Sequence, residues 1–162
     1  MPKFVVEALL YLLDDAFEGN EEHSLLGNLA TVHDDDWLWT PAGGSRSIRD
    51  LVAHAGTAKY VYDNQAFGDA TLFWSRGMAE AQKWTTSLAL ASTWLREGHH
   101  RLRESIAALD DYDLVQQRKV HYGGTEETRR IIAILIEHDV YHAGEINHLR
   151  ALSQGTDRWP GE

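Results

Sequence analysis

The chain has 162 residues and a formal net charge of −10, with 43% hydrophobic and 25% charged residues. This is the composition of an ordinary soluble protein long enough to bury a core, and we expect residues 1–162 to form a single domain. The sequence contains no cysteine, which excludes disulfides and thiolate ligands, so any metal ligands must be His, Asp or Glu. The acidic charge disfavours nucleic acid and anionic membranes as partners.

The first segment, from about Pro2 to Val32, has the apolar spacing of a helix that is interrupted at Gly19 and Asn20. Its apolar start contains Glu7 and lacks a small-residue cleavage site, so it is unlike a secretory signal. No run in the sequence is long and apolar enough to span a bilayer. We therefore expect a cytoplasmic protein.

Residues 33–46 contain three consecutive acids, a proline and two glycines, and they predict a loop. The helix that follows begins at Ser47, where Asp50 stands three residues on, as in a capping box. This helix extends to about Phe67, and His54 lies on its inward stripe. Asp50 is one turn before His54, so it either caps the helix alone or also orients the imidazole as a hydrogen-bond acceptor.

Residues 68–83 show no sustained period and predict a long crossover connection, with at most a short helical turn, held to the bundle by Phe73 and Trp74. A further helix is expected from about Thr85 to Leu109. His99 falls on the inward stripe of that helix. It is either a core histidine that bonds elsewhere, or it belongs to the metal site as a reserve ligand, as a partner of a ligand or as a residue that faces the substrate.

Residues 115–122 can be extended, and Gly123-Gly124 supplies a turn before the last helix, which we expect to be capped at Thr125. Ala143 and Gly144 in the last helix face away from its inward stripe. Two small residues there favour the close approach of another helix, for example from a second subunit.

The last helix carries polar side chains in the middle of its inward stripe. The stripe comprises Ile131, Leu135, His138, His142, Glu145, Leu149 and Leu152. His138 and His142 are one turn apart, so both imidazoles can reach one point beside the helix. With His54 they make three inward histidines on two helices, the ligand number of catalytic zinc sites that keep a position open.

Other interpretations of these residues remain. The histidines could be core residues that bond to buried carbonyls or to Glu145 without a metal. The E-x-x-H pattern of di-iron bundles occurs twice, but residues 47–67 contain no glutamate, which such a site needs on each remaining helix. The H-E-x-x-H pattern of metalloproteases is absent.

Two stretches carry a resemblance to a known family. They are PAGGSRSIRDLVAH at residues 41–54 and EHDVYHAGEINHLR at residues 137–150. With this spacing the chain resembles the DinB-like superfamily of metal-dependent proteins (DinB and YfiT types). The resemblance implies an all-α four-helix bundle in up-down-down-up order with a long crossover, often homodimeric. It places a divalent metal ion on His54, His138 and His142.

The resemblance also implies an activity, because members include S-transferases that use low-molecular-weight thiols. We expect a transferase that uses Zn²⁺ or Ni²⁺ and moves a thiol onto a small electrophilic substrate. Glu145 could accept a proton, serve as a fourth ligand or support His142. A metal-dependent hydrolase and a non-enzymatic metal-binding or stress-response protein are the alternatives.

Overall fold

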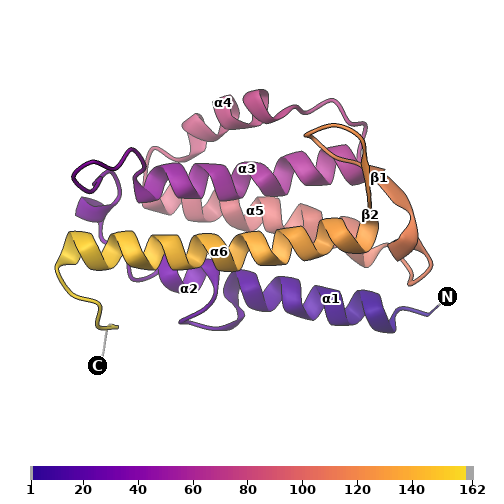
Figure 1. The fold of residues 1–162 in the computed structure, drawn as a ribbon, viewed down its shortest axis with the longest axis horizontal. Helices are drawn as coiled ribbons and strands as arrows, with labels where there is room; N and C mark the ends of the chain where they lie inside the picture. Colours follow the sequence, from indigo (N-terminus) through magenta and orange to yellow (C-terminus); the bar gives the residue numbers. More distant parts are fainter. Residues whose placement is uncertain (1, 160–162) are drawn as a thin grey trace.

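The computed structural model of the protein describes residues 2–159. The helices are α1 (Phe4–Asp14), α2 (Leu25–Leu29), α3 (Ile48–Phe67), α4 (Trp74–Trp84), α5 (Leu88–Ala107) and α6 (Thr128–Gln154). Long helices lie side by side in a bundle, with α2 continuing the course of α1, and α4 lies outside the bundle (Figure 1). The predicted all-α class is therefore confirmed. Within residues 2–159, no helix has the length and apolar character needed to cross a membrane.

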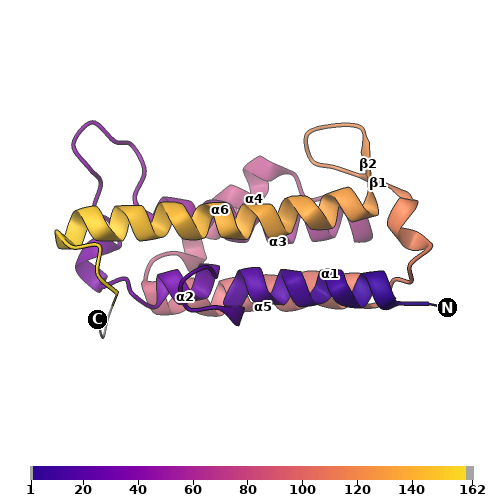
Figure 2. The ribbon, with the colours of Figure 1, turned by 60° about the horizontal axis from the view of Figure 1, so that its bottom comes forward.

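The bundle has α3 and α6 on one side and α1 and α5 on the other (Figure 2). In Figure 1, α1 and α6 run in one direction and α3 and α5 run in the other. The parallel course of α3 and α5 also follows from their hydrogen bonds, because Tyr60 bonds to Trp94 and Asp63 bonds to Ser105 further along both helices. Because α3 and α5 run in the same direction, the segment that connects them must travel back along the length of the bundle.

The returning connection contains α4, an eleven-residue helix where the sequence predicts a long connection with at most a short helical turn. The helix is longer than expected, and its apolar stripe is short: Gly77 and Ala81 are buried, and Trp74 and Met78 are partly buried against the core. Packing on α3 stabilises it. A Cβ atom on Gly77 would lie 2.8 Å from the Cγ2 of Thr57, so only glycine permits this approach.

The interruption of the first helix is confirmed. After α1 the chain makes a π-helical turn from Asp15 to Gly19, and α2 begins only at Leu25. The start of α3 is also confirmed. Asp50 accepts hydrogen bonds from the backbone N–H and the hydroxyl of Ser47, and the Ser47 hydroxyl accepts one from the backbone N–H of Asp50.

The segment before α6 forms a hairpin of β1 (Gln117–Lys119) and β2 (Thr125–Glu127). Gly123 and Gly124 supply its turn with φ angles of 96° and 80°. The expected helix start at Thr125 was wrong, because Thr125 pairs with Lys119 in the hairpin. The ladder ends at Glu127, and α6 starts one residue later.

The core consists of two apolar clusters, one toward each end of the bundle. Helix α6 contributes Ile131, Ile132 and Leu135 to one cluster and Ile146 to the other. Buried polar side chains lie between them, among them Lys59, His99, Asp139 and His142. A polar layer thus crosses the middle of the bundle, and it lies where the stripe of α6 changes from apolar to polar residues.

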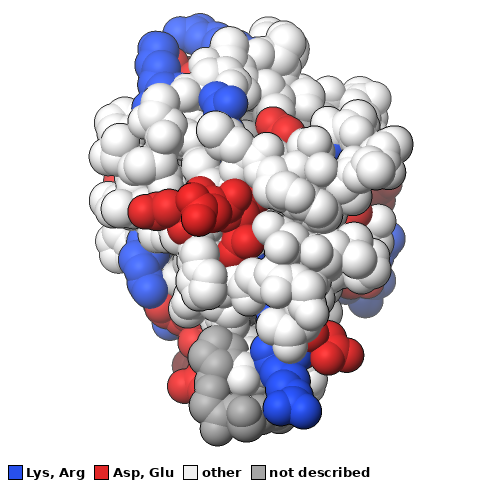
Figure 3. Space-filling model, turned by 90° about the vertical axis from the view of Figure 1, so that its left-hand side faces the viewer, with Lys and Arg blue, Asp and Glu red and all other residues white. Residues whose placement is uncertain are grey.

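Opposite charges share the outer surface. The end of the bundle at the left of Figure 1 carries a small group of acidic side chains near its centre, while basic side chains lie apart from one another toward its margins (Figure 3). The basic residues on this face therefore do not gather into one patch.

Candidate metal centre

The imidazoles of His54, His138 and His142 meet at one point between α3 and α6. The Nε2 atom of His138 lies 3.1 Å from that of His54 and 3.2 Å from that of His142. One ligand atom from each of the three residues lies within 4.8 Å of the others. The structure thus brings together the three histidines predicted from the sequence. They come from two helices, and His54 and His138 are 84 residues apart in the chain.

A carboxylate fixes the orientation of one ring. The Nδ1 atom of His142 lies 2.7 Å from the Oε2 atom of Glu145, and the His142 side chain is almost fully buried. A carboxylate can only accept in this contact, so Nδ1 of His142 carries the proton and its Nε2 presents a lone pair. Metal-binding histidines in proteins commonly show this arrangement.

The other two rings are uncharged at neutral pH. Burial, with the neighbouring His142 as the second cause, lowers the pKa of His54 to about 4 and that of His138 to about 3. Imidazole must be neutral to bind a metal, so these two side chains are in the required state without losing a proton.

The spacing of the nitrogens fits one tetrahedral ion. Bonds of about 2.0–2.1 Å from zinc to nitrogen place two ligand nitrogens about 3.3 Å apart. The observed separations of 3.1 and 3.2 Å are close to this value. Hydrogen bonding alone explains the contacts poorly, because a single N–H on Nε2 of His138 cannot point at both neighbours. A cation would accept all three lone pairs at once.

Comparison with known families decides which family this is. The family model described as the DinB superfamily matches residues 20–146. The chain belongs to the DinB superfamily. The match covers α2 to α5 and α6 as far as Ile146, including all three histidines. None of the curated proteins matches the sequence.

In this DinB-superfamily protein the cluster is bordered by aromatic rings that the sequence analysis did not assign to it. The Trp74 ring contacts His54 edge-on at 5.0 Å between centroids, and His121 stacks on Trp74 at 4.9 Å. Tyr141 contacts His142 edge-on at 5.2 Å. Trp74 had been expected to anchor the crossover, and His121 precedes the turn of the hairpin, which alone brings it to this site.

Two further candidates lie elsewhere. The Asp50 carboxylate bonds to Ser47, so it caps α3 in this DinB-superfamily structure rather than orienting His54. His99 bonds through Nε2 to Asp14 at 3.0 Å and stacks on Phe17, so it is a core histidine facing α1 and the π-helical turn. Both side chains thus contact residues other than the three clustered histidines.

The remaining expectations concern the crossover and the outer face of α6. Trp74 packs against the core cluster as expected, but Phe73 is 62% exposed and does not anchor the segment. The expectation that Ala143 faces outward was wrong, because its side chain is buried within this chain. A Cβ atom on Gly144 would meet nothing within 4 Å, so no helix of residues 2–159 packs closely on Gly144 in this DinB-superfamily chain, and a homodimer remains a prediction.

Proposed function

We propose that His54, His138 and His142 hold one divalent metal ion, Zn²⁺ or Ni²⁺, and that the protein is a metal-dependent transferase. The observation that carries the proposal is the convergence of three imidazoles, with Nε2 of His138 at ligand-to-ligand distance from Nε2 of both His54 and His142. When bound, a divalent ion with three neutral ligands keeps its full charge and lowers the pKa of a thiol or water that joins it.

The residues of the chain would orient and protect this site. Glu145 holds the His142 ring in one tautomer, so Nε2 stays available as a ligand. The Glu145 side chain is 31% exposed, which leaves the carboxylate within reach of a proton from an incoming thiol. Glu145 is therefore both a positioning residue and the candidate proton acceptor.

An enzyme needs one side of the site to be reachable. His54 and His138 are only partly buried, whereas His142 is buried. Trp74, His121 and Tyr141 border the cluster with flat rings, which suit a small, partly apolar substrate. An accessible site favours catalysis over a purely structural ion, whose positions would all be filled by protein.

The expected reaction joins a low-molecular-weight thiol to a small electrophile. The thiol sulfur forms a bond to the electrophilic carbon, the leaving group departs with its electron pair, and the thiol proton passes to a base. Membership in the DinB superfamily supports the choice of a metal-dependent protein. The choice of a thiol as the nucleophile rests on the resemblance to S-transferases of this superfamily.

The test uses protein purified without a histidine tag and loaded with Zn²⁺ or Ni²⁺. It is incubated with a panel of low-molecular-weight thiols and 1-chloro-2,4-dinitrobenzene, and release of chloride measures transfer. We expect a rate above the protein-free rate that disappears in His138→Ala and persists in His148→Ala, an exposed histidine on the same helix. Loaded protein without any such rate would contradict the transferase proposal. Ester hydrolysis by the same samples would then favour the hydrolase, and metal binding alone the non-enzymatic protein.

A further inference from the structure

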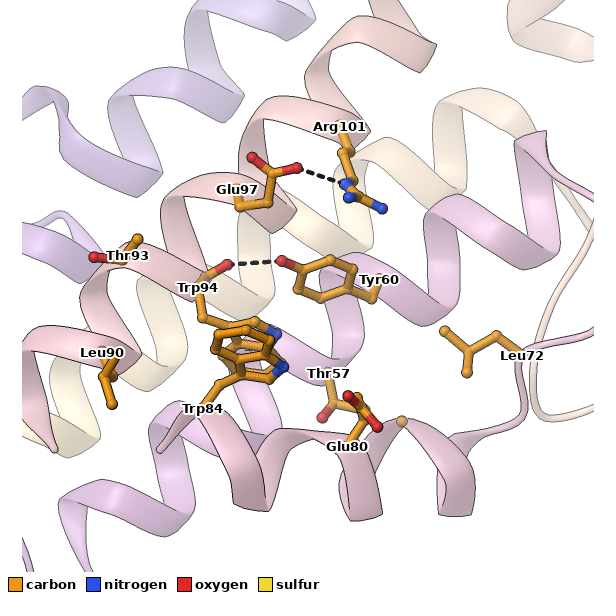
Figure 4. A pocket seen from close by; sticks show the side chains of 11 residues that line it. Thr57, Tyr60, Leu72, Glu80, Trp84, Leu90, Thr93, Trp94, Glu97 and Arg101 are labelled. Atoms are coloured by element: carbon orange, nitrogen blue, oxygen red, sulfur yellow. Dashed lines mark hydrogen bonds and ion pairs between the residues drawn. The ribbon is translucent and has the colours of Figure 1, made fainter. Parts of the chain in front are cut away.

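A cavity lies between α3, α4 and α5, away from the histidine cluster (Figure 4). Its volume is about 620 Å³, which is within the range of pockets that bind small molecules. None of the residues that line it is one of the three clustered histidines or Glu145. The cavity is therefore distinct from the candidate metal centre.

One wall of this cavity is a pair of stacked aromatic rings. Tyr60 and Trp94 stack with centroids 5.3 Å apart, and the Tyr60 hydroxyl donates to the Trp94 carbonyl at 2.9 Å. Glycines hold both rings in place: a Cβ atom on Gly56 would lie 2.1 Å from the Trp94 ring, and one on Gly98 would lie 2.7 Å from the Tyr60 ring. The wall is thus built before any ligand arrives.

The mouth of the cavity exposes apolar side chains to water. Trp84 from α4 is 43% exposed and Leu90 from α5 is 46% exposed, and both line the cavity. Exposed large apolar groups around a pocket commonly mark a binding site. A flat ring that enters between them would remove both from water.

The cavity also contains a polar group without a partner. Thr57 is fully buried, and its hydroxyl makes no hydrogen bond. Buried hydroxyls in proteins almost always have a partner, so this one is an exception. The hydroxyl has no surface open to water, so a ligand in the cavity reaches it only after a rotation of the Thr57 side chain.

The charges around the cavity indicate which ligands it favours. Two carboxylates, Glu80 and Glu97, and one guanidinium group, Arg101, line it (Figure 4). Arg101 bonds to Glu97 at 2.7 Å, so its charge is already paired. Glu80 is paired as well, with Lys83 at 2.6 Å, so the lining offers no unpaired cation that would hold an anionic ligand.

We propose that this cavity is a second binding site, for a planar aromatic molecule that is neutral or positively charged. The ligand packs against the wall of Tyr60 and Trp94, and it forms a hydrogen bond with the Thr57 hydroxyl after the Thr57 side chain rotates toward it. This site does not depend on metal binding by the histidines.

The test uses three planar tricyclic probes that differ mainly in charge: 9-aminoacridine as the cation, acridone as the neutral ring and acridine-9-carboxylate as the anion. Binding to the full chain is measured by calorimetry and by quenching of tryptophan fluorescence. We expect saturable binding of one cationic or neutral probe per chain. The anion should bind at least about tenfold more weakly, because no unpaired cation in the lining compensates for its loss of hydration.

Matched variants locate the probe. Thr57→Val removes the unpartnered hydroxyl without changing the shape, and should weaken binding roughly 2- to 10-fold, the effect of one hydrogen bond. Thr93→Val is the control in the same cavity, because the Thr93 hydroxyl already bonds to the Ala89 carbonyl, and it should change the affinity less than about twofold. His138→Ala should leave probe binding unchanged.

Three results would overturn the proposal. They are the absence of saturable binding by any probe to folded protein, equal binding by wild type and Thr57→Val, and loss of binding in His138→Ala. The last result would place the probe at the histidines instead. Because Thr57→Val removes an unsatisfied buried group, the variant should fold at least as stably as wild type, and circular dichroism checks this.

Discussion

Glu145 accepts a hydrogen bond from Nδ1 of His142 at 2.7 Å, three residues earlier on α6. This contact fixes the tautomer of the most deeply buried of the three clustered histidines. Glu145→Gln should therefore lower the affinity for Zn²⁺ by about 10- to 100-fold while keeping the fold, as is typical for such supporting carboxylates. Competition with a chromophoric chelator measures the affinity.

Glu137→Gln on the same helix is the control for this prediction. Glu137 is exposed and its ion-pair partner is Arg130, not a histidine of the cluster. The control should bind Zn²⁺ as wild type does. Equal affinities for all three proteins would show that Glu145 does not support the site.

The buried ion pair of Lys59 and Asp139 should respond unequally to loss of either partner. The two side chains are each 1% exposed and 2.5 Å apart. Burial raises the pKa of Asp139, although Lys59 opposes it, so Asp139 can take up a proton when Lys59 is replaced. Asp139→Asn leaves a buried ammonium group and should cost about 3–5 kcal/mol. Lys59→Met should cost less.

Urea denaturation of the metal-free proteins measures these free energies of unfolding. Glu80→Gln, which breaks the exposed pair with Lys83, is the control and should leave stability unchanged. A larger loss for Lys59→Met than for Asp139→Asn would contradict the expected protonation of Asp139.

The stability of the metal-free protein should fall in mild acid, in part through His99. Burial, with the charge of Lys59 as the second cause, lowers the pKa of His99 from 6.5 to about 4. The folded state therefore binds fewer protons than the unfolded state between these values. The stabilising contribution is complete above pH 6.5 and is lost as the pH falls toward 4.

His99→Gln isolates this effect, because His54 and His138 titrate in the same direction in both proteins. Between pH 7 and pH 5, wild type should lose about 1–2 kcal/mol more than the variant. Urea denaturation at the two pH values checks it. Identical pH dependence of the two proteins would show that His99 is not held neutral by the fold.

Two glycines in helices should give opposite results when replaced by alanine. A Cβ atom on Gly56 would lie 2.1 Å from the Trp94 ring, so Gly56→Ala should destabilise the protein by about 1–3 kcal/mol. A Cβ atom on Gly144 would meet nothing, so Gly144→Ala should stabilise the chain by about 0.5–1 kcal/mol. Thermal unfolding measures both changes. A destabilising Gly144→Ala would instead indicate that a second subunit packs on this face.

The sequence predicted the parts of this structure that depend on helical spacing. His54, His138 and His142 each fall on an inward stripe, and two long helices with such stripes bring them together. Ser47 and Asp50, the capping residues, predicted where α3 begins, and this start determines the position of His54 along the bundle axis.

Features that depend on tertiary contacts were not predictable in this way. Helix α4 has a short apolar stripe in which only the small residues Gly77 and Ala81 are fully buried, so the sequence does not reveal how long the helix is. His121 reaches Trp74 only through the hairpin, whose pairing involves residues with no apolar alternation. His99 lies on an inward stripe like the clustered histidines, but the opposite side of the core contains Asp14, which binds it instead.

The most direct test of the account is the metal content of protein purified without a histidine tag and dialysed against Zn²⁺ or Ni²⁺. Elemental analysis should find one ion per chain in wild type and in His148→Ala, and almost none in His138→Ala. Wild-type protein without bound metal, or a His138→Ala variant that keeps a full equivalent, would contradict the assignment of His54, His138 and His142 as the metal ligands.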